Sequence, residues 1–166
     1  MNVRICRDPL VPMSGLHKRR ALTGSCRTCH SWGVIDPISP LVRHTDEIPD
    51  EHWNDPRRGG ASWRTFFSRD VTPTTALTTG VSTVPPGQAL APHRHKIVES
   101  YFFIHGHGVV ALGEGEYEVD AGSAVHIPSL TVHGVRNTGS TTLQFFYVFA
   151  TDSFADVEYE FAPGLA

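Results

Sequence analysis

The sequence predicts an all-β domain built as a sandwich or jelly-roll barrel. Its 166 residues are 40% hydrophobic and 19% charged, which suits one globular domain with a real core. Fifteen Gly and twelve Pro residues are set among Val, Thr and Phe, a composition that favours many short strands joined by turns. No segment sustains an amphipathic helical pattern beyond a turn over residues 46–54.

Short apolar runs recur at even intervals from residue 62, and turn-forming residues separate them. The turns are expected at Pro85-Pro86-Gly87, Gly113-Glu114-Gly115, Asp120-Ala121-Gly122 and Asn137-Thr138-Gly139. The expected strands are 62–68, 76–84, 90–95, 100–105, 108–112, 115–119, 124–127, 132–137, 143–149 and 157–161. Strands spaced this evenly are typical of a sandwich or jelly-roll barrel.

Residues 1–43 are predicted to form a loosely ordered basic N-terminal extension, and residues 44–166 the folded domain. The extension has no strand or helix periodicity and holds seven basic against two acidic side chains. All three cysteines, Cys6, Cys26 and Cys29, lie in it. Cys26-Arg27-Thr28-Cys29-His30 has the spacing that attaches haem c, and with Cys6 it could hold zinc; we favour a chance occurrence in a tail.

Charge and hydropathy exclude several classes of partner. Residues 44–166 hold fifteen acidic against seven basic side chains, a balance that repels phosphate, so we expect no nucleic-acid partner. No apolar run approaches the roughly 18 residues of a transmembrane helix, and the start has no apolar stretch that would serve as a secretion signal. We therefore expect a cytoplasmic protein without membrane contact.

Four residues have the chemistry and the spacing of a metal site. His93 and His95 are two residues apart, so on a strand their side chains point to the same face. Glu99 follows across a short turn, and His133 lies on a later strand that can return beside them. Three imidazoles and one carboxylate suit a divalent transition metal with two open coordination positions. The alternative interpretation is that these histidines are ordinary core or surface residues.

The flanking residues carry a resemblance to a known superfamily. Gly87, His93, His95, Glu99 and Gly106 have the spacing G-x5-H-x-H-x3-E-x6-G, and the second half is Gly122-x5-Pro128-x4-His133-x3-Asn137. From residue 62 to 161 the chain resembles the cupin superfamily, although Pro128-Ser129-Leu130 stands where Pro-x-Gly is usual. The resemblance implies a double-stranded β-helix (RmlC-like) fold. It also implies one divalent metal (Fe²⁺, Mn²⁺, Ni²⁺ or Zn²⁺) held by His93, His95, Glu99 and His133, and a homodimer.

Strand periodicity places Tyr101 on the same face as Glu99, so its phenol should face the metal cavity. It could be a core tyrosine bonded to the backbone, or a phenol whose proton a nearby dication removes. His-x-His-x3-Glu-x-Tyr, together with the C-terminal Asp152-x-Phe154-x2-Val157-Glu158-Tyr159, resembles the small cupin-type dimethylsulfoniopropionate lyases. That resemblance implies Tyr101 as the catalytic base and Tyr159 as a second catalytic residue in the pocket.

The function expected from this resemblance is metal-dependent β-elimination of dimethylsulfoniopropionate, or a similar small carboxylate, to acrylate and dimethyl sulfide. Aromatic faces suit the cationic sulfonium. The candidates for this contact are Trp63, Phe103, Phe145, Tyr147 and Phe149. Three alternatives stay open: a metal-dependent dioxygenase using the same site, a cupin that binds a small ligand or sugar without catalysis, and a sugar isomerase or epimerase.

Overall fold

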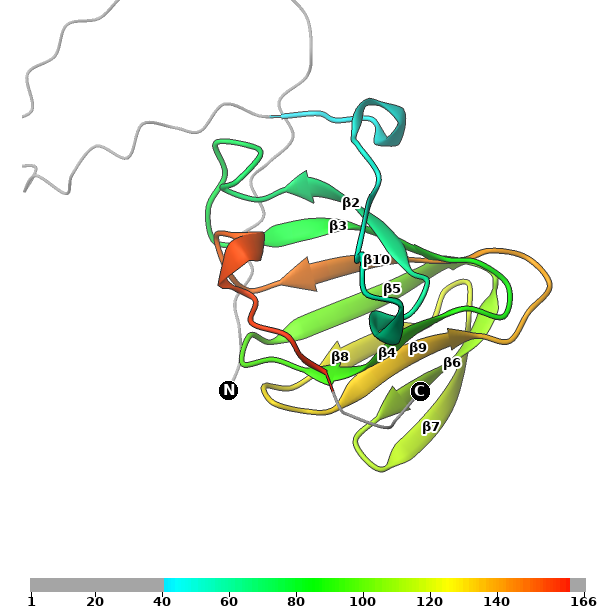
Figure 1. Cartoon of the computed structure of the whole chain (residues 1–166). Coiled ribbons are helices and arrows are strands. Elements are labelled where there is room, and N and C mark those ends of the chain that lie inside the picture. The colour runs from blue at the N-terminus through cyan, green and yellow to red at the C-terminus, as the bar shows by residue number, and fades with distance from the viewer. Residues whose placement is uncertain (1–40, 162–166) are drawn as a thin grey trace, which may run out of the picture. The chain divides into compact units, whose positions relative to one another are not determined.

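The computed structural model describes residues 41–161, which form two antiparallel β-sheets (Figure 1). The first sheet has six strands in the order β1-β2-β3-β10-β5-β8. Their bounds are β1 Glu51–His52, β2 Ser62–Phe67, β3 Thr78–Val84, β10 Leu143–Phe149, β5 Glu99–His105 and β8 Ala124–Ile127. Along β10 every second residue is buried, because alternate side chains of a strand point to opposite faces of the sheet.

The second sheet has five strands in the order β11-β4-β9-β6-β7. Their bounds are β11 Glu160–Phe161, β4 Ala89–Arg94, β9 His133–Asn137, β6 His107–Leu112 and β7 Gly115–Asp120. The core combines aromatic side chains of the first sheet, such as Phe103 and Phe145, with smaller residues of the second, such as Val110 and Val135. The all-β jelly-roll prediction is confirmed. In the part of the chain that the structure describes, no helix has the length and apolar character needed to cross a membrane.

The predicted strands from residue 62 to 149 are found within two residues of their expected ends. One start was misplaced: Ala76 has a φ of 73°, which a strand cannot accommodate, and β3 begins at Thr78. The last predicted strand, 157–161, is wrong over most of its length, because only Glu160–Phe161 pairs. The helical turn expected over residues 46–54 overlaps the 3₁₀ turn η1 (Thr45–Glu47) only at residues 46 and 47, and β1 lies where the rest of it was expected. The sequence signals also missed the 3₁₀ turns η2 (Pro56–Arg58) and η3 (Phe154–Asp156).

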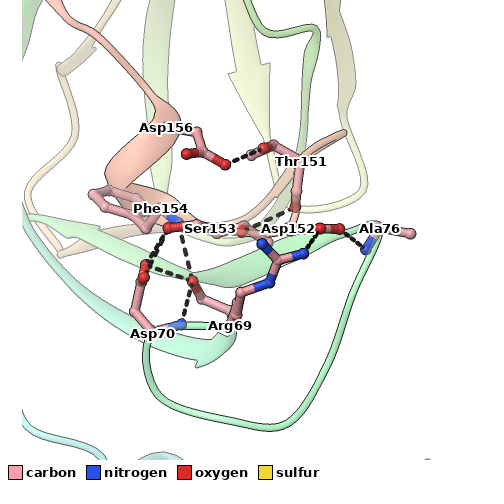
Figure 2. A network of polar contacts seen from close by, with 10 residues as sticks. Arg69, Asp70, Ala76, Thr151, Asp152, Ser153, Phe154 and Asp156 are labelled. Carbon is pink, nitrogen blue, oxygen red and sulfur yellow. Dashed lines mark hydrogen bonds and ion pairs between the residues drawn. The ribbon is translucent and has the colours of Figure 1, made fainter.

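A polar network fixes the C-terminal segment against the loop after β2 (Figure 2). Ser153 caps η3 by accepting a hydrogen bond from the Ala155 N–H, and its hydroxyl donates to Asp70 at 2.7 Å. The backbone N–H of Phe154 donates to the Ser68 hydroxyl, and Asp152 pairs with Arg69. The start of this segment, including Phe154, is therefore held by polar contacts, whereas its end is held by the pairing of β11 with β4.

Most of the predicted extension, including Cys6, Cys26, Cys29 and His30, lies outside the described residues, so the 1–43/44–166 boundary stays a prediction. Its last residue, Arg43, donates hydrogen bonds to the backbone oxygens of Thr65 and Phe66 on β2.

Candidate metal centre and active-site cavity

The four predicted metal ligands lie together in the interior. His93 on β4 pairs directly with His133 at the start of β9, and His95 follows one residue after β4 ends. Glu99 begins β5 in the opposite sheet. All four residues are buried, and one potential ligand atom from each lies within 4.8 Å of the others. The two sheets thus bring three imidazoles and one carboxylate to one point.

Backbone carbonyls orient the three imidazoles. Nδ1 of His93 lies 2.8 Å from the oxygen of Ala91, and the Nδ1 atoms of His95 and His133 make equivalent contacts with Ile97 and Thr131. Because a carbonyl oxygen only accepts hydrogen bonds, each Nδ1 carries the proton. Each Nε2 then presents a lone pair to the site, as a metal-binding histidine requires.

The donor set fits a cation. Oε2 of Glu99 lies 3.2 Å from Nε2 of His95 and 3.2 Å from Nε2 of His133. In the tautomer set by the carbonyls, all of these atoms are acceptors, so they repel one another without a positive charge between them. Nε2 of His133 is buried and makes no hydrogen bond. Burial also lowers the pKa of His93 well below its ordinary value, which keeps that imidazole neutral and suited to metal binding.

Both predicted catalytic tyrosines share a cavity with this group. The cavity measures about 30 Å³, and His93, Glu99, Tyr101 and Tyr159 are among its lining residues. Tyr101 is only 3% exposed, and the Tyr159 ring lies 5.0 Å from the His93 ring. Burial, with the nearby Glu99 carboxylate, raises the pKa of Tyr101 well above its ordinary value of 10. Without a cation in the site, Tyr101 is therefore a neutral phenol.

Comparison with known proteins shows which family this chain resembles in sequence and structure. The family model described as a cupin domain matches residues 80–149. Dimethylsulfoniopropionate lyase DddW of Ruegeria pomeroyi is 33% identical over 75% of this chain and 82% of its own length. The chain belongs to the cupin family. Auxin-binding protein 1 of Arabidopsis thaliana is 28% identical over 72% of this chain and 65% of its own length. The crystal structure of a predicted oxalate decarboxylase from Thermotoga maritima matches with a TM-score of 0.60 at 25% identity, covering 67% of this chain and 99% of that one.

Aromatic side chains make up most of the remaining wall of this cupin cavity. Of the predicted aromatic contacts, Trp63, Phe145, Tyr147 and Phe149 line it, whereas Phe103 is not among its lining residues and packs in the core against Phe145. The sequence interpretation missed Trp53 and Phe154. Trp53 belongs to no strand, and its ring reaches Trp63 at 4.4 Å and Tyr159 at 5.6 Å. Trp53 is not part of a strand-like or helical sequence pattern, so only its aromatic side chain could have indicated a place in the cavity wall.

Proposed function

We propose that this cupin is a metal-dependent lyase that eliminates dimethyl sulfide from dimethylsulfoniopropionate or a similar small carboxylate. The observation that carries the proposal is the placement of Tyr101, a buried phenol that lines one cavity with Glu99 and His93. The 33% identity to a named lyase of this substrate supports the same chemistry.

His93, His95, Glu99 and His133 would hold one divalent metal, and Fe²⁺, Mn²⁺, Ni²⁺ and Zn²⁺ are all compatible with this ligand set. Such an ion would act as a Lewis acid, which would bind a substrate carboxylate and make the adjacent C–H bond more acidic. Its charge also opposes the effects that raise the pKa of Tyr101, since a nearby cation favours the phenolate.

Tyr101 is the base in this proposal. As a phenolate it takes a proton from the carbon next to the carboxylate, and the C–H electron pair forms the C=C bond of acrylate. The C–S bond breaks with its electron pair on sulfur, which leaves as neutral dimethyl sulfide. The zwitterionic substrate thus becomes one neutral product, one anion and one proton. Tyr159, which shares the cavity, is proposed to contact and orient the substrate.

The aromatic wall would hold the sulfonium. Trp53, Trp63, Phe154 and Tyr159 form one aromatic cluster whose neighbouring ring centroids lie 4.4 to 6.3 Å apart. Aromatic faces attract such a cation once it has lost its water shell. The cavity of about 30 Å³ holds one water rather than this substrate. The cavity must therefore widen for this substrate to bind.

The test is headspace detection of dimethyl sulfide from purified protein loaded in turn with Fe²⁺, Mn²⁺, Ni²⁺ and Zn²⁺, with Tyr101→Phe alongside. Release by the wild type and its loss in Tyr101→Phe, at equal metal content, is the expected result. Equal metal loss in the variant would make Tyr101 a ligand and remove the argument for a separate base. No release with any metal would refute the lyase.

A non-catalytic binder of small carboxylates is the second candidate, favoured by the relative named auxin-binding protein 1. It predicts that small carboxylates raise the melting temperature of the metal-loaded protein without being converted. Consumption of oxygen with Fe²⁺ would instead identify a dioxygenase.

We also propose a cytoplasmic homodimer formed through the outer face of the six-stranded sheet. On β5, Phe102 and Ile104 are 50% and 48% exposed, and on β10 Phe146 lies opposite Phe102 and Val148 opposite Ser100. The outward positions of these two strands are uncharged from Ser100 to Ile104 and from Gln144 to Val148. Contiguous exposed apolar surface of this kind marks an interaction site, and a second copy of the same face would cover it.

A further inference from the structure

A chain of hydrogen bonds leads from the active-site cavity to the surface. The hydroxyl of Tyr147, on β10, lies 3.2 Å from Oγ1 of Thr65 on β2. The Thr65 hydroxyl in turn donates to Oε1 of Glu51, on the edge strand β1, at 3.1 Å. Tyr147 and Thr65 are 4% and 5% exposed, whereas Glu51 is exposed to solvent. The chain therefore crosses the sheet from a cavity residue to water.

A gap in β3 allows this crossing. Gly80, on β3, lies between Tyr147 and Thr65: it pairs with Tyr147 of β10 on one side and with Thr65 of β2 on the other. A Cβ atom at Gly80 would lie 2.3 Å from the Tyr147 hydroxyl oxygen. Only glycine lets the phenol pass over β3 and reach β2.

The direction of the chain follows from its last member. An ionised carboxylate only accepts hydrogen bonds, so the single hydroxyl proton of Thr65 points to Glu51. Thr65 can then only accept from Tyr147, whose proton points the same way. Both donors point outward, and Tyr147 keeps a lone pair for the cavity. A proton that reaches this lone pair can displace the Tyr147 proton to Thr65 and the Thr65 proton to Glu51.

We propose that Tyr147, Thr65 and Glu51 form the route by which the proton of the elimination leaves the active site. This inference rests on the proposed function, in which each turnover leaves one proton on Tyr101. Tyr101 and Tyr147 are directly opposite on neighbouring strands and line the same cavity. The cavity that both phenols line has room for one water once the products have left. Removal of the proton along the chain restores the Tyr101 phenolate, and Glu51 passes the proton to solvent.

The test compares Thr65→Val, which keeps the shape but lacks the hydroxyl, with Thr65→Ser, which keeps the hydroxyl. Rapid-quench measurement of dimethyl sulfide separates the first turnover from the steady state. In Thr65→Val we expect a first turnover at the wild-type rate, a burst of about one product per site and a steady-state kcat lowered about tenfold, with KM within about twofold. Thr65→Ser should behave as the wild type.

Glu51→Gln provides a second arm, because Glu51 is exposed and its replacement leaves the core intact. It should show the same burst, whereas Glu118→Gln, an exposed carboxylate on β7, should not. An unchanged kcat in Thr65→Val and Glu51→Gln would overturn the route while leaving the lyase in place. An equal fall in the first turnover and in kcat would also overturn it, since it would show a structural role. A wild type that releases no dimethyl sulfide with any metal would refute the proposed function and the route together.

Discussion

Gly80→Ala tests the close crossing of Tyr147 over β3. An added Cβ would lie 2.3 Å from both the Tyr147 hydroxyl oxygen and the backbone oxygen of Arg64. Alanine is normally better than glycine in a strand, by about 0.5–1 kcal/mol. Overpacking a filled interior costs about 1–3 kcal/mol, and here a backbone oxygen cannot rotate away. The steric cost is larger than the gain from replacing glycine, so we expect the free energy of unfolding to fall by about 1–2 kcal/mol.

For a chain of this length, that loss lowers the melting temperature by about 2–8 °C. The assay is thermal and urea unfolding followed by circular dichroism. Gly139→Ala is the matched control, because an added Cβ there comes no closer than 3.2 Å to another atom. In a Tyr147→Ala background the contacts of the added Cβ with the phenol, 2.3 Å to its oxygen and 2.5 Å to its Cζ, are gone, so Gly80→Ala should cost about 0.5–1 kcal/mol less. If Gly80→Ala is as stable as the wild type, Tyr147 does not cross β3 in this way.

Four further outcomes are expected. His133→Ala should abolish metal uptake in elemental analysis, whereas the exposed His126→Ala should retain it. Tyr101→Phe should retain metal and lose about 10²–10⁴-fold in dimethyl sulfide release. Phe102→Glu should shift the protein from dimer to monomer in analytical ultracentrifugation; an unchanged mass would place the interface elsewhere. The hydrogen bond from Ser153, assisted by others, lowers the pKa of Asp70 below its ordinary 3.8. The stability from Asp70 is therefore present at neutral pH and lost as the pH falls through this lowered pKa. Asp70→Asn should melt below the wild type at pH 7, and the gap should close below about pH 4.

The placement of the metal ligands could be predicted because it depends on local geometry. His93 and His95 share a face through strand periodicity, Glu99 follows after one turn, and Tyr101 shares the face of Glu99 by the same rule. Only His133 required a long-range pairing, and the spacing of the second motif supplied it.

The C-terminal segment could not be predicted in the same way, because its partners are side chains distant in sequence. The residues from Val157 onward have a strand-like composition, but Val157 ends the 3₁₀ turn that Ser153 caps, because its N–H bonds to the carbonyl oxygen of Phe154. Strand pairing begins only at Glu160. Thr65 and Glu51 escaped prediction for a related reason: the contacts of Thr65 with Tyr147 and with Glu51 depend on the order of strands in the sheet, which periodicity does not specify.

The site residues fall into two groups according to their position in the chain: those within the segment that matches the cupin family, and those in the segments that flank it. All four proposed metal ligands, and Tyr101, lie within residues 80–149, the part that matches the cupin family. The aromatic residues Trp53, Trp63, Phe154 and Tyr159 lie outside it, as do Thr65 and Glu51. Metal binding requires a fixed ligand geometry, so that part tolerates little change. The flanking segments supply Trp53, Trp63, Phe154 and Tyr159 to the cavity wall, so differences in these segments change the shape of the cavity in which a substrate would bind. Cupins with the same metal ligands can therefore differ in substrate through these flanks, and identity of the metal ligands alone is a weak guide to the reaction.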